Sequence, residues 1–277
     1  MITSNFARHS GRHCTSGEEE LLIEVGTGSR FKQWSQRKIR RKDFMTDITM
    51  YHGDNGRSGL NATFPFALTG GTWLRCVTLP TPAPVRAAPL FLGGYTFTVG
   101  PHTGETHDVV IVAASDNTVV AYAEEQLLAG TVNALWLSSL GTASSRTGSN
   151  IPPPIGICGT PLIDRASATL FMVALVHEAT GDVFNVFALD LNTGTILDYE
   201  TLKDPGAAGR PTFDPTLVDQ RSGLNLIDGW LFATFAAILA YDKGAYHGWV
   251  IACNQTHLSQ QLFLPTTKNV LGGGAWG

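Results

Sequence analysis

The chain has 277 residues, of which 43% are hydrophobic and only 15% are charged, together with 30 Gly and 14 Pro. This composition is typical of a turn-rich globular protein, and it excludes an intrinsically disordered chain. No apolar run approaches the roughly 20 residues that a membrane-spanning helix requires, so we expect no membrane span.

The charges are unevenly distributed along the chain. Residues 1–45 contain nine of the 19 Lys and Arg but only five of the 23 Asp and Glu, which leaves ten basic and 18 acidic side chains in residues 46–277. Because of this acidic excess, residues 46–277 show no basic surface of the kind that binds nucleic acid. We interpret residues 1–45 as a basic leader that is disordered or mispredicted, and it has no signal-peptide pattern. The alternative is a localisation signal or a basic tail that binds nucleic acid. We expect residues 46–277 to form the folded part.

From residue 88 onward, one pattern of segments occurs three times: a short leader, an apolar strand, a tight turn and a second apolar strand. The leaders are 87–92, 159–164 and 222–227; the strands before the turn are 107–114, 168–175 and 228–235; the strands after it are 118–123, 185–191 and 248–253. The segments are rich in Val, Ile, Leu, Phe and Ala and bounded by Gly, Asp and Asn, which is typical of β-strands.

This repeat of about 60 residues, with helix expected only as a short turn at 123–129, predicts an all-β fold of four-stranded β-propeller blades. A sandwich or jelly roll would give evenly spaced strands without the longer self-similarity. Small residues such as Ala113, Ala174 and Ala233 would let stacked sheets approach closely, and Trp136 would wedge between blades. Asp164 and Asp190 end strands, where we expect them to accept backbone N–H bonds in turns.

The strings THDVVIVAASDNTVVAYA, PPPIGICGTPLID and VFALDLNTG, followed by SGLNLIDGWLFATFA and YHGWVIACN, resemble the repeats of the quinoprotein alcohol dehydrogenase-like (PQQ-like repeat) propeller family. The resemblance runs from about residue 48 to the last residue. It implies a secreted or periplasmic protein with seven or eight blades, some members of which hold pyrroloquinoline quinone (PQQ) and calcium. Three to four blades fit into this chain, so we expect an incomplete propeller in which 272–277 begins a further blade.

The stretch YHGDNGRSGLN, residues 51–61, resembles the opening stretch of that family. Its polar groups His52, Asp54, Asn55 and Arg57 are candidates for a functional pocket, and His247 joins them because Tyr-His-Gly recurs at 246–248. The alternative is that both copies form turns, with Asp and Asn capping backbone groups.

The remaining motifs in the sequence do not predict a catalytic or metal-binding site. HTGETH at 102–107 groups two histidines and a glutamate, but its Gly and Thr favour a solvated loop over a metal site. The four cysteines, Cys14, Cys76, Cys158 and Cys253, form no CxxC pair, and no adjacent pair matches the vicinal disulfide of the family's quinone-binding members. No serine-nucleophile elbow or phosphate-binding loop is present. We expect no catalytic residue and no metal site.

Three functional interpretations remain open at this point. A non-catalytic scaffold would bind a protein or glycan partner through its loops, in keeping with the missing catalytic signatures. A piece of a quinoprotein oxidoreductase would use PQQ and calcium, on the family resemblance alone. A decayed fragment would have no activity of its own.

Overall fold

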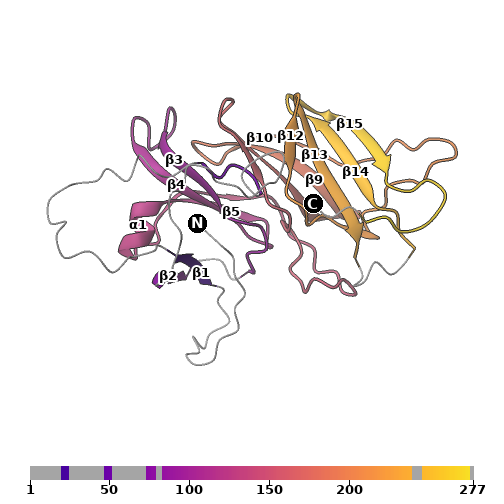
Figure 1. Cartoon of the computed structure of the whole chain (residues 1–277), viewed down its shortest axis with the longest axis horizontal. Coiled ribbons are helices and arrows are strands. Elements are labelled where there is room, and N and C mark those ends of the chain that lie inside the picture. Colours follow the sequence, from indigo (N-terminus) through magenta and orange to yellow (C-terminus); the bar gives the residue numbers. More distant parts are fainter. Residues whose placement is uncertain (1–19, 25–46, 52–72, 79–82, 239–244, 275–277) are drawn as a thin grey trace, which may run out of the picture.

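The structure, a computed structural model, describes residues 20–24, 47–51, 73–78, 83–238 and 245–274. These residues form an almost entirely β protein in which three antiparallel sheets follow one another along the long axis (Figure 1). A separate antiparallel pair joins β1 (Glu20–Glu24), from within the basic leader, to β2 (Trp73–Thr78).

Each of the three sheets is a meander in which consecutive strands are neighbours, except that β11 and β12 of the third sheet both pair with β13. The first contains β3 (Leu90–Thr96), β4 (Thr106–Ala113), β5 (Thr118–Ala123) and β6 (Ala134–Ser139). The second contains β7 (Leu162–Asp164), β8 (Thr169–Glu178), β9 (Gly181–Asp190) and β10 (Ile196–Thr201). The third contains β11 (Val218–Asp219), β12 (Asn225–Ile227), β13 (Trp230–Ala237), β14 (Trp249–Asn254) and β15 (His257–Pro265).

The first strand of the third sheet is broken into two pieces. Both β11 and β12 pair with β13, at opposite ends of it, and two extra residues interrupt the register between them. The buried Gln220 amide fills this break by donating to the backbone carbonyl of Ser222. The third sheet is therefore a four-stranded meander like the other two. The predicted all-β fold of about three to four four-stranded β-propeller blades is confirmed, and the described residues contain three such sheets.

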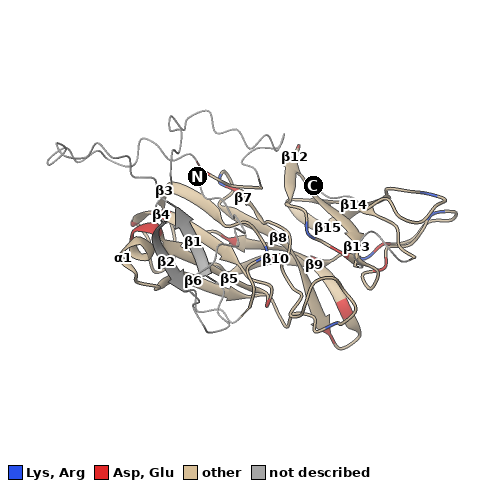
Figure 2. Cartoon of the chain, turned by 60° about the horizontal axis from the view of Figure 1, so that its bottom comes forward, with Lys and Arg blue, Asp and Glu red and all other residues tan. Residues whose placement is uncertain are grey.

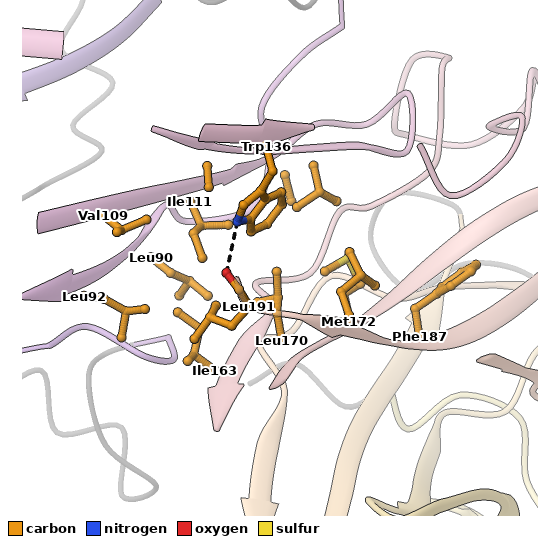
Figure 3. Close-up of a cluster of buried hydrophobic side chains, with 14 of the residues drawn as sticks. Leu90, Leu92, Val109, Ile111, Trp136, Ile163, Leu170, Met172, Phe187 and Leu191 are labelled. Atoms are coloured by element: carbon orange, nitrogen blue, oxygen red, sulfur yellow. Dashed lines mark hydrogen bonds between the residues drawn. The ribbon is translucent and has the colours of Figure 1, made fainter. Parts of the chain in front are cut away.

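The core of the protein lies between the sheets. The first and second sheets enclose one apolar cluster, which includes Leu90, Ile111, Leu170 and Met172 (Figure 3). The second and third enclose another, centred on a group of aromatic rings in which Phe213 lies 5.1 Å from Phe235, centroid to centroid. Strands inside a stack bury both faces, which explains why β8 is buried over eight consecutive residues.

Trp136 joins the first sheet to the second, as the sequence predicted. Its indole N–H donates to the backbone carbonyl of Leu191 at 3.0 Å (Figure 3), and its ring packs on the turn after β9. A β-carbon on Gly194 of that turn, where φ is +70°, would lie 2.5 Å from the indole ring. Glycine is therefore required at this contact for both space and backbone conformation.

The helix α1 (Glu124–Ala129) lies where a short helical turn was expected, directly after β5. Its residue Leu127 is fully buried in a third cluster with Phe91, Val110 and Tyr122, on the face of the first sheet that points away from the second. The free face of the first sheet is thus covered by apolar groups of this chain.

The predicted turn roles of the strand-ending aspartates are confirmed. Asp164 accepts from the N–H of Ala166 at 3.1 Å, and Asp190 accepts from the N–H of Asn192 at 2.6 Å. The expectation for the glycine-rich end is not met in its described part, because Gly272 pairs with His247 in an isolated bridge and begins no new strand. Residues 275–277 lie outside the described residues.

We predict that Trp136→Phe lowers the free energy of unfolding by about 1–3 kcal/mol, since it leaves the Leu191 carbonyl buried without its donor. Chemical denaturation of the purified chain measures this loss. The control is Leu137→Ala at the neighbouring position, whose side chain is 59% exposed and whose loss is expected within about 0.5 kcal/mol. Equal losses for the two variants would contradict the assigned role of the indole.

Candidate functional site

The two ends of the sheets differ in the length of their connections. One end, which we call the loop face, carries the connections 140–161 and 202–217, together with the described residues 245–248 before β14. The other end, the turn face, carries the loop at 97–105, α1 and tight turns such as Asp228–Gly229. Binding residues occur preferentially on long connections held by a rigid scaffold, which makes the loop face the candidate site.

Arg146 ties the connection 140–161 to the third sheet. Its guanidinium donates to the backbone carbonyls of Pro215 at 2.8 Å and Val218 at 2.9 Å, and it forms an ion pair with the buried carboxylate of Asp219. The other oxygen of that carboxylate accepts from the Ser149 hydroxyl at 2.9 Å. Both charges are almost completely removed from water, so this interaction is sensitive to the loss of either partner.

Arg86 ties the same connection to the first sheet. Its guanidinium donates to the Ser115 hydroxyl at 2.5 Å, to the backbone carbonyl of Pro152 at 3.1 Å and to that of Pro154 at 3.4 Å. One connection is therefore held at two places by two arginines that belong to different parts of the chain.

The connection 202–217 is organised around Asp204, whose side chain is fully buried. Its carboxylate binds the Arg210 guanidinium and accepts from the N–H groups of Gly206 at 2.9 Å and Phe213 at 3.0 Å. Burial by itself would raise the pKa of this carboxyl group, but these hydrogen bonds outweigh it and lower the pKa. Arg210 also stacks over Trp249, 5.6 Å from the ring centroid.

Ser144, Asp182 and His177 form a cluster at the same end of the second sheet. The Ser144 hydroxyl donates to one oxygen of Asp182, and His177 Nδ1 lies 2.8 Å from the other oxygen. Nucleophilic catalysis needs the hydroxyl bound to the base itself. Here serine and histidine bind the same carboxylate, so the arrangement organises the loop and does not form a nucleophile–base pair.

The two described cysteines are free and buried. Burial raises the pKa of the Cys158 thiol to about 11, although neighbouring arginines act in the opposite direction, and it raises that of Cys253 to about 12. Both groups are protonated thiols at neutral pH and therefore poor nucleophiles. Cys14 and Cys76 lie outside the residues whose side chains are described.

Residues 47–51 run past the first strand of each of the three sheets. Ile48 forms a bridge with Phe91 of β3, and the carbonyl of Thr49 accepts from the N–H of Ile163 of β7 at 2.8 Å. A β-carbon on Gly223, just before β12, would lie 2.5 Å from Cβ of Tyr51. This segment therefore contacts all three sheets at their inner edges.

The predicted pocket residues are only partly placed. His52, Asp54, Asn55 and Arg57 follow Tyr51 directly but lie outside the described residues. His247 is described, on the loop face of the third sheet, where its Nδ1 lies 3.1 Å from the carbonyl of Thr267. This contact is with a nearby turn of the same sheet. That His247 shares a pocket with the other candidates stays a prediction.

The HTGETH motif lies on the turn face. Glu105 bridges His102 and His107 at 2.9 and 3.0 Å, and the second nitrogen of His107 lies 2.6 Å from Glu125. Burial acts to lower the pKa of His107, but hydrogen bonds to the two glutamates outweigh it and raise the pKa. In the described part of the chain, no group of three or more His, Cys, Asp or Glu side chains is arranged to hold a metal ion.

The anchoring arginines of the loop face were missed by the sequence analysis. The partners of Arg86 and Arg146 are backbone carbonyls, a hydroxyl group and a carboxylate 73 residues away, whereas Arg210 pairs with Asp204 in its own connection. No local motif marks these three arginines among the 19 Lys and Arg of the chain, and only the folded chain shows their partners.

Comparisons with known proteins give no family assignment. No protein-family model matches the chain, and no curated protein matches it. Among solved structures, it is similar to a europium-containing methanol dehydrogenase at 14% identity and TM-score 0.40, over 66% of this chain and 26% of that one. The quinohemoprotein alcohol dehydrogenase of Comamonas testosteroni gives 13% identity and TM-score 0.42, over 80% and 41% of the two chains.

BamB of Moraxella catarrhalis is similar at 12% identity and TM-score 0.30, over 74% of this chain and 70% of that one. The chain therefore spans less than half the length of the two dehydrogenases. At these identities and TM-scores the similarity carries no argument on function, and the assignment of blades rests on the strand order and stacking described above. No helix in the described residues is long and apolar enough to cross a membrane.

We predict that Asp219→Ala lowers the free energy of unfolding by about 3–5 kcal/mol, because it leaves the Arg146 guanidinium buried without its counter-charge. Limited proteolysis should then cut within residues 140–161 faster than in the native chain. The control is Asp198→Ala on the exposed side of β10, with an expected loss within about 0.5 kcal/mol. A similar loss for both variants would contradict the role of the buried pair.

We predict a pH-dependent contribution from His107. Because its pKa is raised in the folded chain, its stabilising effect is fully present below the unfolded pKa of 6.5 and is lost as the pH rises through the folded value. The difference in the free energy of unfolding between the native chain and His107→Asn should therefore shrink between mildly acidic and alkaline pH. Leu137→Ala, which removes no ionisable group from an exposed position, is the control and should show no such trend.

Proposed function

We propose that this protein is a non-catalytic β-propeller scaffold that binds a protein or glycan partner on its loop face. The observation that carries the proposal is the way the two long connections are held. The guanidinium groups of Arg86, Arg146 and Arg210 donate hydrogen bonds to backbone carbonyls, a hydroxyl group and buried carboxylates. These contacts fix the two connections to the sheets.

Such anchoring favours binding because it lowers the entropy lost when a partner orders the loops. The connection 140–161 is fixed to both the first and the third sheet, and 202–217 is fixed to its own carboxylate and to β15. The surface is therefore organised before any partner arrives.

The exposed side chains of these two connections are small and mostly uncharged. They include Ser145, Thr147, Gly148, Asn150, Pro152 and Pro153 from the first connection, and Pro205, Ala207, Ala208, Gly209 and Thr212 from the second. The exposed charges are Lys203 and Asp214. A surface of this kind loses little hydration energy on contact and offers hydroxyl groups and backbone amides, which suits the polar surface of a glycan or a protein.

The alternative, a quinoprotein oxidoreductase, requires a site for PQQ and calcium. Calcium takes six to eight oxygen ligands, usually with several carboxylates among them. The described residues contain no cluster of carboxylates suited to a metal ion, and Cys158 and Cys253 are separate free thiols. The described residues thus do not fit the group that the family resemblance implies, and we derive no reaction through it.

Substitution of an exposed loop-face residue tests the proposal. The full chain is presented to a panel of immobilised glycans and, separately, cross-linked in an extract of its source cells. Binding of the species found is then titrated for the native chain and for Ala208→Arg. We expect Ala208→Arg to weaken binding by about tenfold or more, because a long charged side chain at an exposed position of the connection 202–217 obstructs a partner that contacts this connection.

Ala166→Arg, which changes another exposed alanine, in a tight turn on the turn face, is the matched control and should bind like the native chain. Equal weakening by both variants, or no bound species in either assay, would overturn the proposal. Calcium-dependent reduction of a dye by alcohols or sugars after addition of PQQ would overturn it in favour of the oxidoreductase.

A further inference from the structure

Two histidines and two glutamates meet on the turn face of the first sheet. We call this group, which consists of His102, Glu105, His107 and Glu125, the histidine cluster. Glu105 Oε2 lies 2.9 Å from His102 Nδ1 and 3.0 Å from His107 Nε2. The other nitrogen of His107, Nδ1, lies 2.6 Å from Glu125 Oε1, and the other nitrogen of His102, Nε2, lies 3.2 Å from the backbone carbonyl of Leu135. All four imidazole nitrogens therefore face an oxygen atom.

The chemistry of these contacts determines the protonation of both rings. Backbone carbonyl and ionised carboxylate oxygens only accept hydrogen bonds, so each nitrogen that faces one must carry a proton to bond it. Glu105 is ionised, because hydrogen bonds from His107 and His102 lower the pKa of its carboxyl group. A neutral imidazole has one N–H group and the imidazolium cation has two. The four contacts are therefore all hydrogen bonds only when His102 and His107 are both cations.

The histidine cluster joins three elements of the first sheet. Two of its members belong to the loop 97–105 between β3 and β4, and His107 belongs to β4. Glu125 follows the buried Glu124 in the acidic first turn of α1, which is coloured red in Figure 2, and Leu135 lies in β6. Loss of a proton from either ring breaks a hydrogen bond and leaves a nitrogen lone pair facing an oxygen atom. Proton loss therefore weakens the attachment of the loop to α1 and to β6.

The other ionisable groups next to His107 are bound elsewhere. Asp108, the following residue of β4, accepts from the N–H of Gly94 at 2.6 Å. Tyr95, which stands opposite His107 in β3, donates its hydroxyl to the side chain of Asn192 at 3.1 Å. In the described part of the chain, the charge of the histidine cluster thus depends on its own four side chains.

We propose that the histidine cluster is a pH-sensitive latch, which holds the loop 97–105 against α1 and β6 while both imidazoles are protonated and releases it when they lose their protons. The two imidazole rings lie 5.7 and 6.1 Å from the ring of Phe97, centroid to centroid, and Phe97 is only 1% exposed. Release uncovers this apolar side chain. The other side of the loop stays attached, because the Thr98 N–H donates to Asn192 at 2.9 Å. The latch lies on the turn face, so it does not depend on the function proposed for the loop face.

The latch should be closed within a limited range of pH. Burial acts to lower the pKa of His107, but hydrogen bonds to Glu105 and Glu125 outweigh it and raise the pKa. The contribution of His107 is therefore fully present below the unfolded value of 6.5 and is lost as the pH rises through the higher folded value. The pKa of Glu105 is lowered, so its contribution is fully present above the unfolded value of 4.5 and is lost as the pH falls through the lower folded value. The loop should be held most firmly between these two unfolded values.

Amide hydrogen exchange of the full chain, corrected for the intrinsic effect of pH on exchange, tests the proposal. Three amides report the closed loop: Phe97 donates to Glu105 at 3.0 Å, Gly104 donates to Phe97 at 2.8 Å and Glu105 donates to His102 at 2.9 Å. We expect their protection to fall about tenfold or more between about pH 5.5 and about pH 8.5, because each proton lost removes a hydrogen bond to a charged group. The amide of Gln255, which donates to Gly229 in the third sheet, is the internal control and should keep its protection.

Glu125→Gln tests the contact between α1 and the ring of His107. The amide keeps the size of the carboxylate but not its charge, so His107 should lose its proton at a lower pH than in the native chain, as followed by the ¹⁵N chemical shifts of the ring. The protection of the loop amides should fall at that lower pH as well. Glu200→Gln, on β10 of the second sheet, is the matched control and should leave both transitions unchanged.

Several results would overturn the proposal. One is a loop that keeps its protection over this range of pH, or that loses it together with the amide of Gln255. Another is a loop whose protection falls at the same pH in the native chain and in Glu125→Gln. A ring of His102 or His107 with a single N–H group at about pH 5.5 would also overturn it, and this measurement on the native chain requires no variant.

Discussion

The structure depends on one constraint: the inner strands of each sheet are apolar on both faces, so each sheet must be covered on both sides. β8 shows this most clearly, with consecutive residues from Thr169 to Val176 buried between the first and third sheets. No sheet of this kind is stable alone in water, because both of its apolar faces would be exposed. Stacking satisfies the constraint in the middle of the array, and α1 satisfies it at one end. The loop face and the exposed leucines of β15 both follow from this arrangement.

Stacking also determines how the connections are held. Consecutive strands within a sheet are neighbours and several are joined by tight turns, but between sheets the chain must travel from the last strand of one sheet to the first strand of the next. These crossings form the long connections 140–161 and 202–217. Their polar backbone groups lie beside an apolar core and must find partners there. The guanidinium groups of Arg86 and Arg146 supply several donors each, which explains why a protein with few charges uses them at these places.

Much of the fold could be predicted from the sequence. The strand at 118–123 was predicted with the bounds that the structure gives, because an asparagine turn before it and a change of composition after it mark both ends. β9 begins at Gly181 and not at 185, since it pairs with β8 over its whole length through polar residues that carry no strand signal. The broken first strand of the third sheet could not be predicted, because its interruption is stabilised by the buried amide of Gln220. The loop anchors could not be predicted either: Arg146 and Asp219 are 73 residues apart.

The sequence by itself determined the class of the protein, the repeat of about 60 residues, the wedge at Trp136 and the turn roles of Asp164 and Asp190. These features depend on local chemistry or on periodic patterns, which the chain carries wherever it folds. Only the tertiary structure decided which polar groups hold the loops by hydrogen bonds, that Ser144 and His177 share one carboxylate, and that the leucines of β15 remain exposed. Those properties arise from contacts between segments far apart in the chain, and no local pattern contains the positions of its distant partners.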